Sequence, residues 1–133
     1  MFTRRATLAF SLAAALVAGA SAMAFAEPEH TPFTPAAFQA AQHAGKPILV
    51  QIHASWCPVC AAQAPILSEL LSQPQYRDMV VFRVDFDSQK DAVKSFKARE
   101  QSTLITFKGT TEVGRSVGDT HKGSIEALLS HAI

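Results

Sequence analysis

The stretch Ser55–Cys60 reads SWCPVC and contains both cysteines of the 133-residue chain, spaced C-x-x-C. An apolar run over residues 47–52 precedes it and predicts a buried strand, whereas a helical pattern follows over residues 61–71. The two thiols therefore lie where a strand leads into a helix. Because a helix N-terminus carries unpaired N–H groups and about half a positive charge, it favours a thiolate there. We predict that Cys57 is the nucleophile. Cys60, one turn further on, is predicted to be the more buried of the two and can close a disulfide with Cys57.

The first 26 residues have the pattern of a secretory signal peptide. A basic start is followed by an apolar, alanine-rich core over residues 8–18 and by Ala24-Phe25-Ala26, a small-x-small cleavage pattern. A membrane anchor is the alternative, but the core is shorter than the roughly 20 residues that a helical span needs. We therefore predict a signal peptide over residues 1–26, a single domain over residues 27–133, and a periplasmic or secreted location.

Charge and cysteine usage limit the classes of function. The 12 Lys and Arg residues nearly balance the 11 Asp and Glu residues, and no basic cluster stands out, which argues against nucleic acid as a partner. A structural disulfide framework would use more cysteines at wider spacings, so a single C-x-x-C pair in an exported chain indicates redox chemistry. We expect a monomer without a cofactor, free of the membrane once the signal peptide is removed.

Helical and strand patterns alternate after a lead-in over residues 27–33 that is expected to be flexible. Thr34 and Pro35 are typical of a helix start, and Gly45 is typical of a helix end. Ser88 is predicted to cap a later helix that runs to about residue 100. Strands separated by helices imply parallel pairing, and two adjacent strands imply a hairpin. The predicted order is α-β-α-β-α-β-β-α, a central mixed sheet flanked by helices in the α/β class; its strands are expected over residues 48–53, 79–85, 103–107 and 112–117, and its last helix from Lys122.

Trp56 directly precedes the cysteine pair, and Pro65 stands five residues after the second cysteine. With a strand before them and a helix around them, these residues make the chain resemble the thioredoxin family over essentially all of residues 27–133. The resemblance implies the thioredoxin fold and a thiol–disulfide oxidoreductase that acts on protein thiols and disulfides with a redox partner. It also implies that Cys57 attacks the substrate, that Cys60 resolves the mixed disulfide, and that Trp56 shields the pair and contacts the substrate.

Three positions depart from the family pattern. Gln51 stands where the family has a buried Asp that moves protons for the second cysteine, and glutamine cannot exchange a proton near neutral pH. Arg83 stands where many members have a Lys, and it is better at holding a fixed ion pair. Ser102 takes the place of a cis-proline, so we expect a trans peptide bond there and a hydroxyl that could bond a cysteine sulfur. Together with the Pro58-Val59 dipeptide between the cysteines, these residues are expected to shape the site.

The departures predict an oxidoreductase with a narrow set of partners. The resolving cysteine lacks its proton carrier, so general disulfide reduction should be slow, and a proline at position 102 should widen the substrate range. Two other interpretations stay open. The cysteines could bind a soft ion such as Cu(I), with His53 as a third ligand, or the fold could serve as a redox-inert binding module. The sequence leaves the direction of electron flow, the substrates and the electron donor undetermined.

Overall fold

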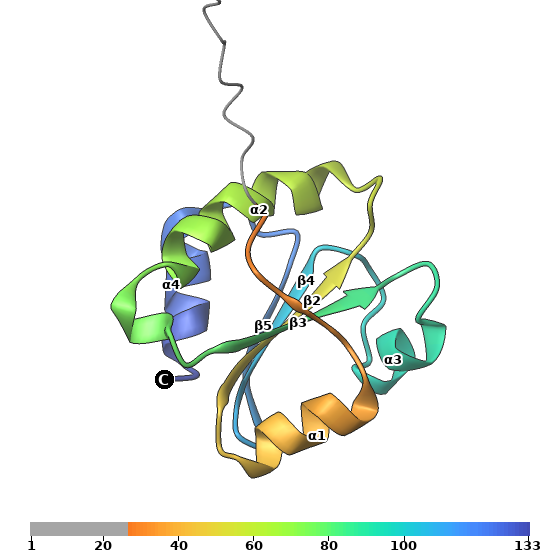
Figure 1. Cartoon of the computed structure of the whole chain (residues 1–133). Coiled ribbons are helices and arrows are strands. Elements are labelled where there is room, and N and C mark those ends of the chain that lie inside the picture. Colours follow the sequence, from red (N-terminus) through yellow and green to blue (C-terminus); the bar gives the residue numbers. More distant parts are fainter. Residues whose placement is uncertain (1–26) are drawn as a thin grey trace, which may run out of the picture.

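The computed structural model describes residues 27–133, so the predicted signal peptide lies outside the described residues (Figure 1). Five strands form one sheet in the order β1-β3-β2-β4-β5. Apart from β1 and a short 3-10 turn, the elements follow the predicted order. The strands are β1 (Thr31–Pro32), β2 (Pro47–His53), β3 (Val80–Asp85), β4 (Thr103–Lys108) and β5 (Thr111–Val117); the helices are α1 (Pro35–His43), α2 (Pro58–Leu71), α3 (Lys90–Ser95) and α4 (Lys122–Ser130), with the 3-10 turn η1 at Pro74–Tyr76.

The central strand β2 pairs parallel with β3 and antiparallel with β4. Figure 1 shows α2 and α4 on one face of the sheet and α1 and α3 on the other. Because helices cover both faces, β2 is apolar at nearly every position and is buried from residue 48 to residue 52. The prediction of a mixed sheet flanked by helices is therefore confirmed.

The two faces of the sheet carry two separate apolar clusters. The α1/α3 face is built largely from phenylalanine rings whose centroids lie 5.2–6.3 Å apart, mostly edge to face. The α2/α4 face is aliphatic and packs β2, β3 and β4 against the two helices. The rings are Phe33, Phe38, Phe82, Phe96 and Phe107; the aliphatic residues include Leu49, Leu67, Leu70, Val81, Leu104, Ile125 and Leu129.

The predicted helix signals around α1 are confirmed. The Thr34 hydroxyl accepts a hydrogen bond from the Ala37 N–H at 3.1 Å, and Pro35 occupies the first helical position. Gly45 follows the last turn with φ +68°, a backbone conformation that glycine adopts without steric cost. These local choices fix where the chain enters β2, and therefore where β2 delivers the cysteines.

The lead-in before α1 is more ordered than the sequence predicted. Thr31 and Pro32 form β1, which pairs parallel with β3, and the Phe33 N–H donates to the Arg83 carbonyl at 3.0 Å. The prediction of a flexible segment was wrong here because Phe33 inserts into the aromatic cluster and holds the segment along the sheet edge. Short edge pairings of this kind give no periodic signal in the sequence.

The helix expected from Ser88 to about residue 100 is shorter than predicted. It spans Lys90–Ser95 with Gln89 at its N-cap, and Ser88 instead donates its N–H and hydroxyl to the Asp85 carboxylate. The chain leaves the helix through Lys97, which has φ +53°. Within residues 27–133, no helix combines the length and the apolar character needed to cross a membrane.

Candidate active site

The C-x-x-C motif lies at the junction of β2 and α2, as predicted. Cys57 is the N-cap residue of α2, and Pro58 takes the first helical position. The Cys57 N–H donates to the Ala54 carbonyl at 3.2 Å, which closes the turn after β2. The Cys57 Sγ accepts the Cys60 N–H at 3.1 Å, so the nucleophile takes the role that a Ser or Asp side chain has at other helix starts.

Both thiols are reduced and buried. Cys57 is 3% exposed and Cys60 is 4% exposed, and they pack with Ala54 against the Phe86 ring. We had expected Cys60 to be clearly the more buried of the two, and this expectation was wrong. Because their exposed fractions are nearly equal, exposure alone does not assign the roles of the two cysteines.

Ionisation separates the two cysteines. Burial, together with the hydrogen bond to Cys57, raises the pKa of the Cys60 thiol from an ordinary value of 9.0 to about 11. Backbone N–H groups of Ala54 and Ser102 act in the opposite direction, because they bond the charged sulfur. Cys60 is therefore a protonated thiol near neutral pH, which assigns the first attack to Cys57 and the later step to Cys60.

The raised pKa of Cys60 predicts a stability change at high pH. Between pH 9 and pH 11 the unfolded thiol loses its proton while folded Cys60 keeps it, so the free energy of unfolding of the reduced protein falls as pH rises. The expected slope approaches about 1.4 kcal/mol per pH unit. Urea titrations of the reduced protein and of the Cys60→Ala variant across this range give the difference, because other groups titrate in both. Parallel curves for the two proteins would contradict the buried, protonated Cys60.

Apolar side chains lie on the surface beside the buried thiols. Trp56 is 58% exposed, and its indole N–H donates to Asp87 Oδ2 at 2.7 Å, which fixes the ring next to the motif. Val59 is exposed between the two cysteines. Exposed apolar groups around a reactive site are typical of a surface that contacts another chain.

Ser102 differs from the expectation drawn from the sequence. Its peptide bond is trans, as predicted, but its φ is +58°, a left-handed value that is disfavoured for a residue with a side chain. The hydroxyl donates to the Gln101 carbonyl and not to a cysteine sulfur. The backbone of Ser102 acts on Cys60 instead, in the direction that lowers the pKa of this thiol. Ser102 therefore shapes the site through its backbone.

Gln51 and Arg83 are register partners on β2 and β3, on the α2/α4 side of the sheet. Gln51 is buried, and its Oε1 has no hydrogen-bond partner within residues 27–133. The Arg83 guanidinium donates through Nη1 to Glu27 Oε2 at 2.8 Å, and its buried Nε has no partner within the same residues. The Arg83 hydrogen bond holds the pKa of the Glu27 carboxyl below its usual value. Arg83 thus holds an ion pair, and its partner comes from the segment before β1.

His53 does not join the cysteines. Its Nε2 lies 4.0 Å from Glu27 Oε1. Burial is the main cause that lowers the pKa of the imidazole, and the nearby Arg83 charge acts in the same direction. Within the described part of the chain, no group of three or more His, Cys, Asp or Glu side chains is arranged to hold a metal ion. A third ligand to the Cys57–Cys60 pair from His53 is therefore not part of this geometry.

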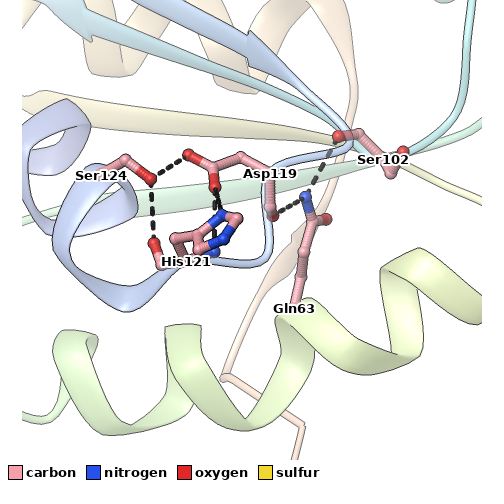
Figure 2. Close-up of polar contacts among 5 residues, drawn as sticks. All are labelled: Gln63, Ser102, Asp119, His121 and Ser124. Carbon is pink, nitrogen blue, oxygen red and sulfur yellow. Dashed lines mark hydrogen bonds and ion pairs between the residues drawn. The ribbon is translucent and has the colours of Figure 1, made fainter.

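Sequence analysis missed one polar residue of the site, Gln63 on α2. Its side chain is buried at 3% exposure and its Nε2 donates to the Ser102 carbonyl at 3.2 Å and to the Asp119 carbonyl at 2.9 Å (Figure 2). A signal was available, since Gln63 stands between Cys60 and Leu67 on the stripe of α2 residues that faces the sheet. A polar residue on an apolar stripe has to find buried partners.

These observations define a class of protein: an α/β domain whose thiol pair sits at a helix N-terminus, built for thiol–disulfide exchange. The thioredoxin family model matches residues 29–131. The chain is 33% identical over 88 residues to a thioredoxin of Mycobacterium tuberculosis, covering 66% of this chain and 75% of that protein. It is 36% identical over 95 residues to an H-type thioredoxin of Brassica campestris, covering 71% and 75%.

Solved structures agree with the sequence relatives. The crystal structure of Trxlp from Edwardsiella tarda EIB202 superposes with a TM-score of 0.72 at 45% identity, covering 74% of this chain and 95% of that one. The thioredoxin NaTrxh of Nicotiana alata superposes with a TM-score of 0.68 at 26% identity, covering 80% and 96%. The chain therefore belongs to the thioredoxin family, whose members are thiol–disulfide oxidoreductases.

Proposed function

We propose that this protein is an exported thiol–disulfide oxidoreductase that exchanges disulfides with a narrow set of protein partners in the periplasm or outside the cell. The observation that carries the chemistry is the pair itself: Cys57 caps α2, and Cys60 is kept protonated by burial. The signal-peptide pattern of residues 1–26 supports export. The exposed apolar side chains of Trp56 and Val59, which adjoin the cysteines in the sequence, suit contact with a polypeptide substrate.

In the reducing direction the exchange takes two steps. The Cys57 thiolate attacks one sulfur of the substrate disulfide, which forms a mixed disulfide and releases the first substrate thiolate. Cys60 then gives up its proton and attacks Cys57 Sγ, which forms the Cys57–Cys60 disulfide and releases the second substrate thiolate. Two electrons pass to the substrate, and a dithiol reductant returns them to the protein. In the oxidising direction the same steps run backwards.

The proton of Cys60 limits the second step. Cys60 must ionise before it can attack. The buried Gln51 stands at the position of the family's proton carrier, and its amide cannot take the proton. Loss of a general base typically slows a proton-transfer step by a factor of about 10²–10⁴. Mixed disulfides should therefore persist unless the partner itself favours their release, which supports a narrow range of partners.

The proposal is tested by producing the full chain in a bacterium with a periplasm. We expect the exported fraction to contain a protein that begins at Glu27 by mass spectrometry, and the purified protein to reduce insulin with dithiothreitol as donor, more slowly than a thioredoxin from the cytoplasm. Retention of the residues before Glu27 would contradict the signal peptide. Insulin reduction as fast as that by the cytoplasmic thioredoxin would contradict the narrow range of partners. Absence of disulfide exchange in both the reducing and the oxidising direction would contradict the proposed activity. The assay is repeated with added Cu(I), and a loss of insulin reduction would then indicate that the thiols bind the metal.

A further inference from the structure

The amide of Gln63 ties three parts of the fold together. From the middle of α2, its Nε2 donates to the carbonyl of Ser102, ahead of β4, and to the carbonyl of Asp119, ahead of α4 (Figure 2). One side chain therefore uses both amide hydrogens on loops that lie 39 and 56 residues away in the sequence. Such a buried side chain restricts how these two loops can move relative to α2.

The loop on one side of this tie is held in a disfavoured conformation. Ser102 is buried at 6% exposure and has φ +58°, a value that a non-glycine residue keeps only where its surroundings impose it. Its carbonyl accepts two hydrogen bonds, from Gln63 and from the Gly118 N–H at 3.1 Å. These two bonds orient the peptide plane after Ser102, while the hydroxyl bond to the Gln101 carbonyl orients the plane before it.

The loop on the other side is firmly anchored. The Asp119 carboxylate accepts the His121 N–H at 2.9 Å through Oδ1 and the Ser124 hydroxyl through Oδ2, which joins it to the start of α4 (Figure 2). The Ser124 hydroxyl bond lowers the pKa of the Asp119 carboxyl, so this carboxylate stays charged near neutral pH. The Asp119 carbonyl is therefore a fixed point, and Gln63 transmits that rigidity to Ser102.

We propose that Gln63 is a positioning residue for the second step of disulfide exchange. It follows Cys60 by three residues on the buried stripe of α2 and bonds the Ser102 carbonyl, so it holds the Ser102 backbone, with its N–H, beside the Cys60 sulfur. Negative charge develops on Cys60 only when this thiol attacks the mixed disulfide, and a preoriented N–H stabilises that charge. The first attack, by Cys57, does not use this N–H. The inference rests on the proposed role of Cys60 and deepens it by naming the residue that supports its ionisation.

A purely structural role of Gln63 predicts different effects on the rates of the two exchange steps. If Gln63 only joined α2 to the two loops, its loss would lower stability and would slow both steps alike or neither. If it positions the Ser102 N–H, its loss slows the second step selectively, at every pH where Cys60 must still ionise. The two steps can be timed separately with Ellman's reagent, because Cys57 releases one thionitrobenzoate on attack and Cys60 releases the other on closing the disulfide.

The experiment compares the reduced full protein with its Gln63→Met variant, which keeps the length of the side chain and lacks the amide. We expect the second release to slow by about tenfold across pH 7–9, the size expected for one lost bond to a charged group, with the first release changed less than about twofold. Tyr76→Phe is the matched control, because it removes the buried bond from Tyr76 Oη to Ser130 Oγ at the far end of α2. It should lower stability and leave both releases unchanged.

Equal changes in both releases, or an unchanged second release, would overturn the positioning role of Gln63. Absence of a second release in the unmodified protein would instead contradict the proposed use of Cys60, so the two failures are distinguishable. If Gln63→Met does not fold, Gln63→Asn takes its place with the same expectations, since it keeps a polar amide that is too short to reach both carbonyls.

Discussion

Replacing Cys57 by serine is expected to lower disulfide exchange by a factor of about 10³ or more, because a hydroxyl is scarcely ionised where a thiolate is needed. Replacing Cys60 by serine should give a different defect. Cys57 still attacks, but nothing resolves the product, so a mixed disulfide with the substrate accumulates. The structure assigns these roles through ionisation, since burial keeps Cys60 protonated with a pKa of about 11.

The measurement is mass spectrometry of each variant after exposure to a disulfide substrate, without a reductant. Cys60→Ser should carry the substrate as a covalent adduct on Cys57, and Cys57→Ser should carry none. The variant that lacks both cysteines serves as the control for adducts formed at other residues, since the sequence contains no further cysteine. Adducts on Cys60 in the Cys57→Ser variant, at a rate near that of the unmodified protein, would show that the roles are reversed.

Replacing Ser102 by proline is expected to lower the free energy of unfolding by about 3 kcal/mol and to slow exchange. Proline fixes φ near −65°, whereas Ser102 has φ +58°. Proline also removes the backbone N–H at position 102, and the Ser102 backbone is one of the groups that lower the pKa of Cys60. The resemblance to the family had suggested that proline would widen the substrate range, and the left-handed backbone of Ser102 reverses that expectation.

Ser102→Gly is the matched control for this substitution. Glycine adopts positive φ readily and keeps the N–H, while it loses the hydroxyl bond to the Gln101 carbonyl. Its unfolding free energy should stay within about 1 kcal/mol of that of the unmodified protein, the usual value of one neutral hydrogen bond. Urea denaturation of the three proteins gives the comparison. A stable, active Ser102→Pro variant would mean that the loop rebuilds around proline without loss.

The site could be located from the sequence because its placement is local. An apolar run covered on both faces gives β2, a helical pattern gives α2, and the cysteines lie between them within a few residues. Capping by Thr34 and the glycine after α1 depend on neighbours three or four positions away. The alternation of strands and helices then leaves few arrangements of the sheet, which is why the order of elements was predicted well.

Other features depend on residues far apart in the sequence. Phe86, in the loop after β3, packs against the cluster that contains both cysteines, and the ion pair of Arg83 comes from Glu27. No local pattern announces either contact. Strand β1 likewise exists because Phe33 enters the aromatic cluster on the α1/α3 face, so its two residues pair with β3 despite having no strand periodicity of their own.

Sequence alone determined that this chain folds as a sheet between helices and places two thiols at a helix start, because backbone periodicity and capping act over a few residues. Only the tertiary structure decided which groups surround those thiols. Ser102 is left-handed, and Gln63 reaches across to hold it, because hydrogen bonds between segments 39 and 56 residues apart impose a conformation that neither segment would adopt by itself.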